Sequence, residues 1–243
     1  MQVSVVIPAY NEATYIDRLL GALEKQKDVE FEVIVADAQS GDGTEEVIKD
    51  FQDKMKLTLL QSPPRGPAAA RNEGAAIAKG EWLLFLDADC DLPDENFIRT
   101  MVDVAKENGW STATPKVAHS DASVLENVGS KLNYWYIRAL ARTKHPVAPG
   151  WCILTKRALF EENLGFNEKI HFGEDYDYVS RAGYAGFGFV EKTYYFVDLR
   201  RPRAEGWRFA VKGVANEIYR HTHHYNLENN PISYKFGNHK KRK

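Results

Sequence analysis

The residues that point most directly to chemistry are two acids, Asp87 and Asp89, which end the apolar run WLLFL. Carboxylates are hard oxygen ligands of the kind that Mg²⁺ or Mn²⁺ accepts. In an extended segment, residues i and i+2 project to the same side, so both carboxylates could hold one ion. Such an ion would neutralise a diphosphate and stabilise it as a leaving group. The alternative is two solvated acids that begin a turn into the segment DLPD at residues 91–94.

A second group of acids, Glu174, Asp175 and Asp177, lies in the stretch GEDYDYVSRAGY. A carboxylate can remove a proton from an attacking hydroxyl group, and close carboxylates raise one another's pKa, which suits a proton acceptor. A structural interpretation is also available, in which Asp175 and Asp177 cap a helix and Arg181 pairs back one turn to Asp177. The residues alone leave both interpretations open.

Two common phosphate-binding motifs are absent from the sequence. No G-x-G-x-x-G follows the first apolar run, which argues against a dinucleotide-binding Rossmann site, and no G-x-x-x-x-G-K-[ST] is present to form a P-loop. A phosphate site in this chain therefore cannot depend on a glycine cradle. It needs a metal ion, which is the role already considered for Asp87 and Asp89.

Strand and helix patterns alternate through the first half of the chain. Apolar runs predict strands at residues 3–9, 31–37, 57–61 and 81–89. Helical spacing of apolar residues, or an alanine-rich composition, predicts helices around residues 16–23, 47–51, 68–80 and 97–105. This alternation indicates βαβ units and an α/β fold with a mainly parallel central sheet that is flanked by helices.

The ends of these strands are where a ligand would bind, because ligands of open parallel sheets lie outside the carboxyl ends of the strands. Here those ends are followed by PAYNE at residues 8–12, by Asp37, and by DAD at residues 87–89. We expect these three segments to converge at one edge of the sheet.

The second half of the chain is less regular. A long helix is expected at residues 123–142, with an aromatic patch at Tyr134, Trp135 and Tyr136, and another at 206–225. With no linker or repeat in sight, we expect one domain over residues 1–220, followed by a basic tail at 221–243. Residues 1–115 would form its regular half and residues 116–220 its less regular half.

Composition excludes several classes of protein. The chain has 243 residues, of which 44% are hydrophobic, so it can bury a core and is neither disordered nor fibrous. No apolar run approaches the roughly 18 residues of a membrane span, and the first residues lack the basic region of a signal peptide. The two cysteines, Cys90 and Cys152, form neither a disulfide framework nor a zinc site. We therefore expect a cytoplasmic protein.

The net charge of −2 conceals an asymmetry. Residues 200–243 contain 11 Lys and Arg against three Asp and Glu, a net of +8, so residues 1–199 carry −10. A basic end on an acidic body predicts an anionic partner at that end. The basic segment HKKRK, with Trp207, Phe209 and Tyr219 before it, suggests peripheral contact with an inner membrane surface.

Four motifs together resemble a known family. VSVVIPAYNE, VIVADAQSGDGT, GPAAARNEGAAIAKGEWLLFLDAD and GEDYDYVSRAGY, in this order and spacing, are similar to family 2 glycosyltransferases with the GT-A fold. The resemblance runs from Val3 to Gly183. It implies a Rossmann-like central sheet, to which we add a helical C-terminal extension, and it favours the metal-binding interpretation of Asp87 and Asp89.

The resemblance also implies roles in binding a nucleotide sugar. The residues it assigns to the donor are Pro8, Ala9, Tyr10, Glu12, Asp37, Arg71, Asp87, Ala88 and Arg201, and it assigns the Mn²⁺ or Mg²⁺ ion to Asp89 with Asp87. Asp37 would accept a hydrogen bond from the base, which suits uracil and is compatible with guanine. Family members often carry two adjacent acids here, whereas Ala38 follows Asp37, so UDP and GDP both stay open. For Arg71 the alternative is a surface ion pair with Glu73 or Glu81.

For the acceptor side, the resemblance implies that Asp175 is the catalytic base of an inverting displacement, with Glu174 beside it. Gly150 and Trp151 lie where such enzymes place a loop that touches the sugar or the acceptor; a buried aromatic is the ordinary alternative for Trp151. The segment LRRPRAEGW lacks the Gln-x-x-Arg-Trp motif of processive synthases, which argues for transfer of a single sugar. Arg200, Arg201 and Arg203 are either phosphate-binding residues or a solvated basic edge.

The expected function is a metal-dependent, inverting, non-processive transfer of one sugar from a UDP- or GDP-linked donor to an acceptor hydroxyl or lipid phosphate. A glycan, a polyprenyl phosphate and a small metabolite all remain possible acceptors, and nucleic acid is not expected to be a partner. One alternative is a sugar nucleotidyltransferase, although that class would carry a glycine-rich basic loop where this chain has PAYNEA. Another is a catalytically silent module that binds a nucleotide or a membrane surface.

Overall fold

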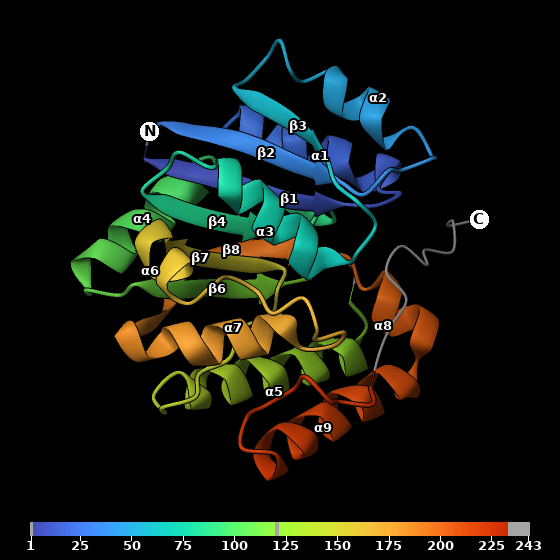
Figure 1. Cartoon of the computed structure of the whole chain (residues 1–243), viewed down its shortest axis with the longest axis vertical. Coiled ribbons are helices and arrows are strands. Elements are labelled where there is room, and N and C mark those ends of the chain that lie inside the picture. Colours follow the sequence, from blue (N-terminus) through green and yellow to red (C-terminus); the bar gives the residue numbers. More distant parts are fainter. Residues whose placement is uncertain (1, 120–121, 233–243) are drawn as a thin grey trace.

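The first half of the chain forms the parallel part of one mixed sheet (Figure 1). The computed structural model describes residues 2–119 and 122–232. In chain order the first elements are β1 (Val3–Ala9), α1 (Ala13–Glu24), β2 (Phe31–Asp37), α2 (Thr44–Lys49), β3 (Leu57–Gln61), α3 (Pro67–Ile77) and β4 (Trp82–Leu86). The strands lie in the order β3-β2-β1-β4, and all three pairings are parallel. The predicted alternation of strands and helices is confirmed. The strand predicted at 81–89 was too long: β4 ends at Leu86, and a hydrogen bond from the Cys90 N–H to the Asp87 carbonyl (3.1 Å) closes a turn, so Asp87 and Asp89 do not lie on an extended segment.

The second half extends the same sheet with strands of both directions. Its elements are β5 (Cys90–Asp91), α4 (Phe97–Glu107), β6 (Thr112–Ala118), α5 (Val124–Leu140), β7 (Cys152–Lys156), α6 (Arg157–Glu162), α7 (Glu174–Ala182), a 3₁₀ turn (Gly183–Ala185), β8 (Phe187–Val197), α8 (Arg200–Glu205) and α9 (Trp207–Thr222). The order continues β4-β7-β6-β8-β5. β7 is antiparallel to both of its neighbours, whereas β6 and β8 are parallel. The sheet is therefore parallel on one side and mixed on the other.

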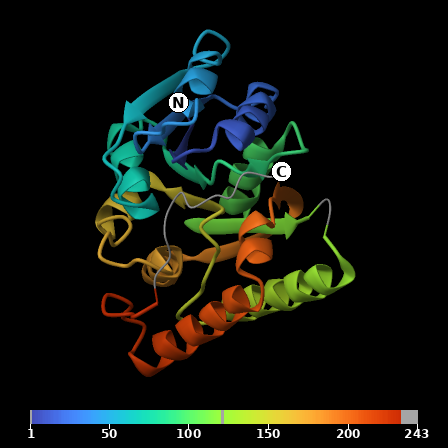
Figure 2. The ribbon, with the colours of Figure 1, turned by 90° about the vertical axis from the view of Figure 1, so that its right-hand side faces the viewer.

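Helices cover both faces of the sheet, as Figure 2 shows for α1 and α3. Because side chains alternate along a strand, β1 sends Val5 and Ile7 to one face and Val6 to the other. On the first face these strands pack against α1, whose Ile16, Leu19, Leu20 and Leu23 are fully buried. The opposite face packs against α3, α6 and α7 through a second cluster. Two apolar layers thus hold the sheet rigidly beneath its carboxyl edge.

Close packing of α3 on the sheet depends on a small residue. A Cβ placed on Gly74 would overlap the Val6 side chain, so the helix can approach β1 only because this position is glycine. Ala68, Ala69 and Ala70 in the preceding turn are buried as well. This close approach brings Arg71, on the same helix, into the interior.

The two long helices of the second half, α5 and α9, lie together at the end of the molecule away from α2 (Figure 1). Both were predicted and are confirmed. α5 begins with a capping box, in which Ser123 and Glu126 satisfy one another's backbone N–H groups. Within the described residues, none of the helices combines the length and the apolar character required to cross a bilayer.

Each of the two predicted boundaries in the chain can be compared with the structure at that position. The boundary at residues 115 and 116 coincides with a register shift in the pairing of β6 with β8. At the other boundary, α9 continues through residue 220 to Thr222, and Leu227 beyond it is buried. The segment HKKRK lies outside the described residues.

Candidate active site

Loops from three strands meet at the carboxyl edge of the parallel sheet, as expected. Ala9 at the end of β1 pairs in register with Asp37 at the end of β2, and β4 runs beside β1 on its other flank. The side chains of Ala9 and Ala88 belong to the apolar core, and Pro8 is buried as well. These three residues therefore pack in the core below the carboxyl edge of the sheet. Tyr10, at the start of the loop, is half-buried.

Asp37 fastens the loops after β1 and β2 to one another. The carboxylate is 1% exposed and accepts hydrogen bonds from the backbone N–H of Ser40 (3.0 Å) and from its hydroxyl. The Ser40 hydroxyl oxygen in turn accepts from the backbone N–H of Asn11 at 2.8 Å. Asn11 closes the arrangement, since its side-chain oxygen accepts from the N–H of Gly41. The acid predicted to bind the base is thus held in place by both loops.

Arg200 joins two acids that follow different strands. Its Nη2 is 2.7 Å from Glu12 Oε1 and 3.2 Å from Asp89 Oδ2, and its guanidinium lies 4.1 Å from the centre of the Tyr15 ring. Glu12 and Asp89 are both largely buried. The structure therefore places Arg200, the first residue of α8, directly against the predicted donor site.

The other two arginines of this segment do not accompany it. Arg203 pairs with Glu126 on α5, at 2.7 Å from Nε to Oε1. The side chain of Arg201, which the resemblance assigned to the donor, lies outside what the structure describes. The basic segment is therefore not a uniform solvated edge, because Arg200 is turned inward.

Arg71 connects the two groups of acids. Its Nη2 is 2.7 Å from Asp87 Oδ1 and its Nη1 is 3.0 Å from Glu174 Oε1. The residue is 2% exposed, so the alternative of a surface ion pair is wrong. Glu73, one partner considered for it, pairs instead with Arg65. The acid that follows β4 and the acid that begins α7 are consequently held by one buried cation.

The loop before β7 also holds both groups of acids, through hydrogen bonds of its backbone. The N–H of Gly150 donates to Asp175 Oδ2 at 2.5 Å, and its carbonyl accepts from Arg71 Nη2 at 3.3 Å. The carbonyl of Trp151 accepts from the N–H of Asp87 at 3.1 Å. The Trp151 ring is partly buried against the core, in keeping with the ordinary interpretation of this residue. Gly150 and Trp151 therefore act through their backbones on both groups of acids.

Asp177 forms the ion pair that the structural interpretation gave it, but neither Asp175 nor Asp177 caps the helix, so that part of the interpretation is wrong. Asp177 pairs with Arg181 one turn later, at 2.8 Å. The N-cap of α7 is Gly173, and no side chain caps the helix. Asp175 instead accepts from the N–H groups of Gly150 and Tyr176. The first turn of α7 thus directs one acid, Asp175, to the loop that carries Gly150.

A family comparison identifies this arrangement. The model of the family described as Glycosyl transferase family 2 matches residues 4–164, about two thirds of the chain. The chain belongs to glycosyl transferase family 2. The resemblance drawn from the motifs is confirmed at the level of the family.

Individual relatives of this family 2 member share its core but are longer. ExoO of Rhizobium meliloti, a succinoglycan biosynthesis protein, is 28% identical over 191 residues, which are 72% of this chain and 53% of ExoO. The glycosyltransferase AglE of Haloferax volcanii is 29% identical over 193 residues, 76% of this chain and 62% of AglE. The chain thus spans between about half and two thirds of the length of these relatives.

Solved structures confirm the GT-A fold. The mannosyltransferase PcManGT of Pyrobaculum calidifontis, in complex with GDP-Man and Mn²⁺, superposes with a TM-score of 0.75 at 21% identity, over 91% of this chain and 64% of PcManGT. TarS of Staphylococcus aureus, residues 1–349 in complex with UDP-GlcNAc, gives 0.66 at 22% identity, over 90% of this chain and 67% of that one. At these identities the likeness concerns the fold.

Burial raises the pKa values of three acids in this candidate site. Burial and the neighbouring Glu174 raise the pKa of Asp175 to about 7, against the opposing effect of Arg71. Burial likewise raises the pKa of Asp89 to about 7, against Arg200. The pKa of Asp87 is raised by burial, with Arg71 opposing. Asp175 is therefore suited to accept a proton near neutral pH.

The two acids after β4 could bind a divalent ion whose remaining ligands are phosphate oxygens of the substrate. The described residues contain no group of three or more acids, histidines or cysteines placed to enclose a metal. Mg²⁺ is ordinarily held by one or two carboxylates and substrate phosphates, and so requires no such group. Arg71 engages Oδ1 of Asp87 and Arg200 engages Oδ2 of Asp89, while the described chain offers no partner to the second oxygen of either. Two hard oxygen donors are thus available to a metal.

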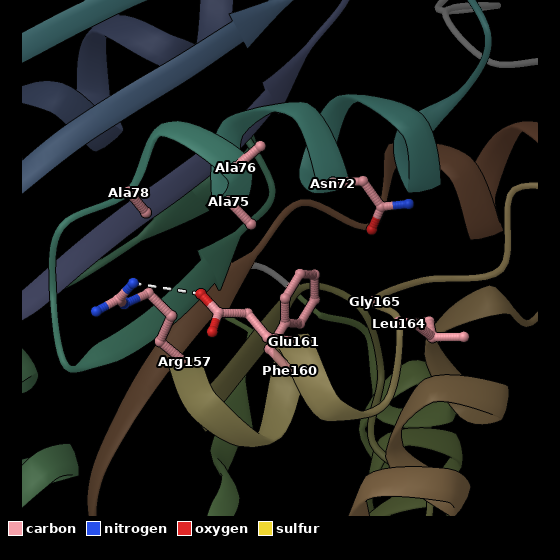
Figure 3. Close-up of a pocket in the computed structure, with 9 residues that line it drawn as sticks. All are labelled: Asn72, Ala75, Ala76, Ala78, Arg157, Phe160, Glu161, Leu164 and Gly165. Carbon is pink, nitrogen blue, oxygen red and sulfur yellow. Dashed lines mark hydrogen bonds and ion pairs between the residues drawn. The ribbon is translucent and has the colours of Figure 1, made fainter.

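A cavity of about 270 Å³ lies apart from this site, between α3 and α6. Figure 3 shows its lining, including the ion pair of Arg157 with Glu161. None of the residues predicted to act on donor or acceptor lines it. We assign it no part in the chemistry.

Two contributors to the site escaped prediction. Tyr15 lies beneath the Arg200 guanidinium, and Ser40 bonds both Asp37 and Asn11. The contacts of Arg200 span 188 residues to Glu12, and single-sequence periodicity carries no information about such a pair. The S-G-D-G turn signal around Ser40 was visible, but it indicates only a turn.

Proposed function

We propose that this chain transfers one sugar from a UDP- or GDP-linked donor to an acceptor hydroxyl or a lipid phosphate, with a divalent metal and with inversion. The observation that carries the proposal is the bridge of Arg71 between Asp87 and Glu174. It links a pair of acids suited to a metal diphosphate with a pair suited to proton transfer. The complexes of PcManGT with GDP-Man and of TarS with UDP-GlcNAc support a nucleotide-sugar donor.

Residues 1–115 would bind the donor. Asp37 would accept a hydrogen bond from the base, with Pro8, Ala9, Tyr10 and Glu12 forming the wall of the base and ribose pocket. Asp87 and Asp89 would hold Mn²⁺ or Mg²⁺, which neutralises the diphosphate leaving group when bound. Arg71, Arg200 and Arg201 would supply the remaining positive charge around it, since arginine forms strong charge-assisted contacts with phosphate.

Residues 116–220 would bind the acceptor. Asp175 would take the proton of the attacking hydroxyl, and its position is held by the N–H groups of Gly150 and Tyr176. Inversion follows from attack on the face of the sugar opposite the nucleotide. The absence of Gln-x-x-Arg-Trp from the segment that begins at Arg200 supports transfer of a single sugar. A peripheral membrane contact near the basic end, residues 221–243, belongs to the same proposal.

The experiment begins with the free protein and a panel of UDP- and GDP-sugars, with and without Mn²⁺. The correct donor should raise the melting temperature in the presence of the metal, since a ligand stabilises by its affinity and concentration. Hydrolysis of that donor should then be measured. Release of pyrophosphate from a nucleoside triphosphate and a sugar phosphate would instead identify a nucleotidyltransferase. Absence of both stabilisation and hydrolysis across the panel would contradict the proposal.

A further inference from the structure

Helix α5 presents an apolar stripe to the solvent. Val124, Val128, Leu132 and Trp135 recur at the spacing of one helix face, and Val124 is 81% exposed and Trp135 62%. Ala139, one turn further along, is exposed as well. A helix on the surface of a globular protein ordinarily directs such a stripe inward.

Helix α9 repeats the pattern. Trp207, Val211, Val214 and Ile218 form its stripe, with Trp207 73% and Val214 61% exposed. Its inward face is polar: Asn216 and Arg220 are its buried residues. Helix α9 is thus reversed relative to the usual arrangement of a surface helix, whereas α5 exposes its apolar stripe in addition to burying Ile137.

The two helices contact one another through polar side chains. The Tyr136 hydroxyl donates to Glu217, which also accepts from Arg220 at 2.8 Å. Near the beginning of both helices, Glu126 of α5 pairs with Arg203, just before α9. These contacts hold α5 and α9 side by side and running the same way, as Figures 1 and 2 also show.

The positions of these contacts place both stripes on one side of the pair. Tyr136 follows Trp135 by one residue, whereas Glu217 precedes Ile218 by one. Each residue turns about 100° around the helix axis, so each contact lies about a quarter turn from its stripe, in opposite senses on the two helices. Because the helices run in the same direction, the two stripes face the same way. They form one surface, which we call the α5–α9 face: Val124, Val128, Leu132, Trp135, Trp207, Val211, Val214 and Ile218.

The charges that the structure describes on the exposed sides of α5 and α9, and that form no ion pair, are of one sign. The acids of the two helices, Glu126 and Glu217, are turned inward and engaged by arginines. Lys131, Arg142 and Arg208 are exposed, and within the described part of the chain none of them forms an ion pair. An apolar surface with a cationic rim complements an anionic lipid headgroup layer above its hydrocarbon.

We propose that the α5–α9 face rests on the surface of an anionic bilayer, with α5 and α9 lying in its plane. Trp135 and Trp207 would occupy the interface, where tryptophan is preferred. The proposal extends the peripheral membrane contact of the proposed function, and it moves that contact from the basic end to two helices. The surface also supplies an acceptor dissolved in the membrane to the same molecule that holds the donor.

The cationic rim argues against a second copy of this chain as the occupant. A two-fold dimer brings the same patch of both subunits together. Such an interface would bring Lys131 and Arg208 of both subunits together at its rim, and the face has no outward acid in the described residues to pair with them. Anionic headgroups lack this conflict.

Flotation with lipid vesicles tests the proposal. The protein is mixed with vesicles of phosphatidylcholine alone, or of phosphatidylcholine and phosphatidylglycerol in equal parts. We expect it to float with the anionic vesicles and to be released by salt. Val128→Glu with Val214→Glu should lower the partition coefficient by at least about tenfold, because two apolar contacts become charged. Lys131→Ser with Arg208→Ser should lower it roughly tenfold on anionic vesicles.

A matched control carries the same change elsewhere. Ile77→Glu with Leu164→Glu alters two exposed aliphatic residues outside the face and should float as the unaltered protein does. Failure of the unaltered protein to float, or equal loss in this control, would overturn the proposal. So would a dimer in solution that Val128→Glu with Val214→Glu converts to a monomer. Donor hydrolysis without vesicles should be equal in all variants, so its loss throughout would count against the proposed function alone.

Discussion

Arg71 and Glu174 lie 3.0 Å apart in the interior of the protein, although 103 residues separate them in the chain. Arg71 belongs to α3, which packs on the parallel strands, and Glu174 begins α7, which packs on the mixed part of the sheet. The pair therefore joins the half of the molecule that would bind the donor to the half that would bind the acceptor. Asp87, on the other side of the same guanidinium, makes the junction part of the proposed metal site.

Replacing Arg71 by alanine should lower both stability and turnover. The substitution leaves Asp87 and Glu174 without the cation that compensates them, and breaking a buried pair in this way costs about 3 kcal/mol or more. Urea unfolding should report the loss, and donor hydrolysis should fall with it. Arg99→Ala is the control, because Arg99 pairs with Asp28 and Asp103 in solvent and should cost less than about 1 kcal/mol. Equal losses in the two variants would contradict a special role for Arg71.

Replacing Gly150 by alanine should impair turnover more than stability. A Cβ there would lie 2.8 Å from Arg71 Nη2 and 3.2 Å from Asp175 Oδ2, so both side chains must move. A displacement of about 1 Å in a catalytic group can cost roughly a hundredfold in rate. Steady-state donor hydrolysis measures the effect. Gly21→Ala is matched to it, because a Cβ meets nothing within 4 Å at this position of α1, and it should gain about 0.5–1 kcal/mol with unchanged turnover.

The parallel half of the fold could be predicted from the sequence because its signals are local. Each buried strand is a continuous apolar run, and each helix shows its own face, as at Leu19 and Leu20. β8 escaped prediction because Gly186 and Gly188 interrupt its pattern. A Cβ on Gly188 would overlap the Trp110 ring, so packing from a distant residue, not strand propensity, selects glycine there.

The candidate site, like the fold, could be predicted from the sequence only in part. The strand ends predicted where Asp37, Asp87 and Asp89 would gather, since parallel strands share one carboxyl edge. The partners of Arg71 and Arg200 could not be predicted, because they depend on how distant elements pack. The alternative of a surface ion pair for Arg71 failed for this reason: neighbouring acids in sequence are visible, and burial by α3 packing is not.

The rate of donor hydrolysis should fall on the acid side of about pH 7. Burial beside Glu174 raises the pKa of Asp175 to about 7, and a general base acts only when it is deprotonated. Below that pH, kcat/KM should decline by about tenfold for each pH unit, because the protonated fraction of Asp175 dominates. Asp175→Asn should remove most of the activity and the part of this dependence that Asp175 causes, while Asp89, whose pKa burial also raises to about 7, keeps its own part. Asp177→Asn, which loses only the contact with Arg181, should keep the same pH profile.

Metal-dependent donor binding should separate Asp89 from Asp175. Asp89→Ala removes a carboxylate of the proposed metal site, whereas Asp175→Asn removes the proposed base and leaves Asp87 and Asp89 in place. A donor present at a hundred times its Kd stabilises a protein by about 2.7 kcal/mol. In melting curves with Mn²⁺, Asp175→Asn should retain this stabilisation and Asp89→Ala should lose it, and EDTA should abolish it in the unaltered protein. A ligand of the ion is expected to lose only the metal-dependent part of the stabilisation. If Asp89→Ala kept the full shift in melting temperature, Asp89 would not be a ligand of the metal.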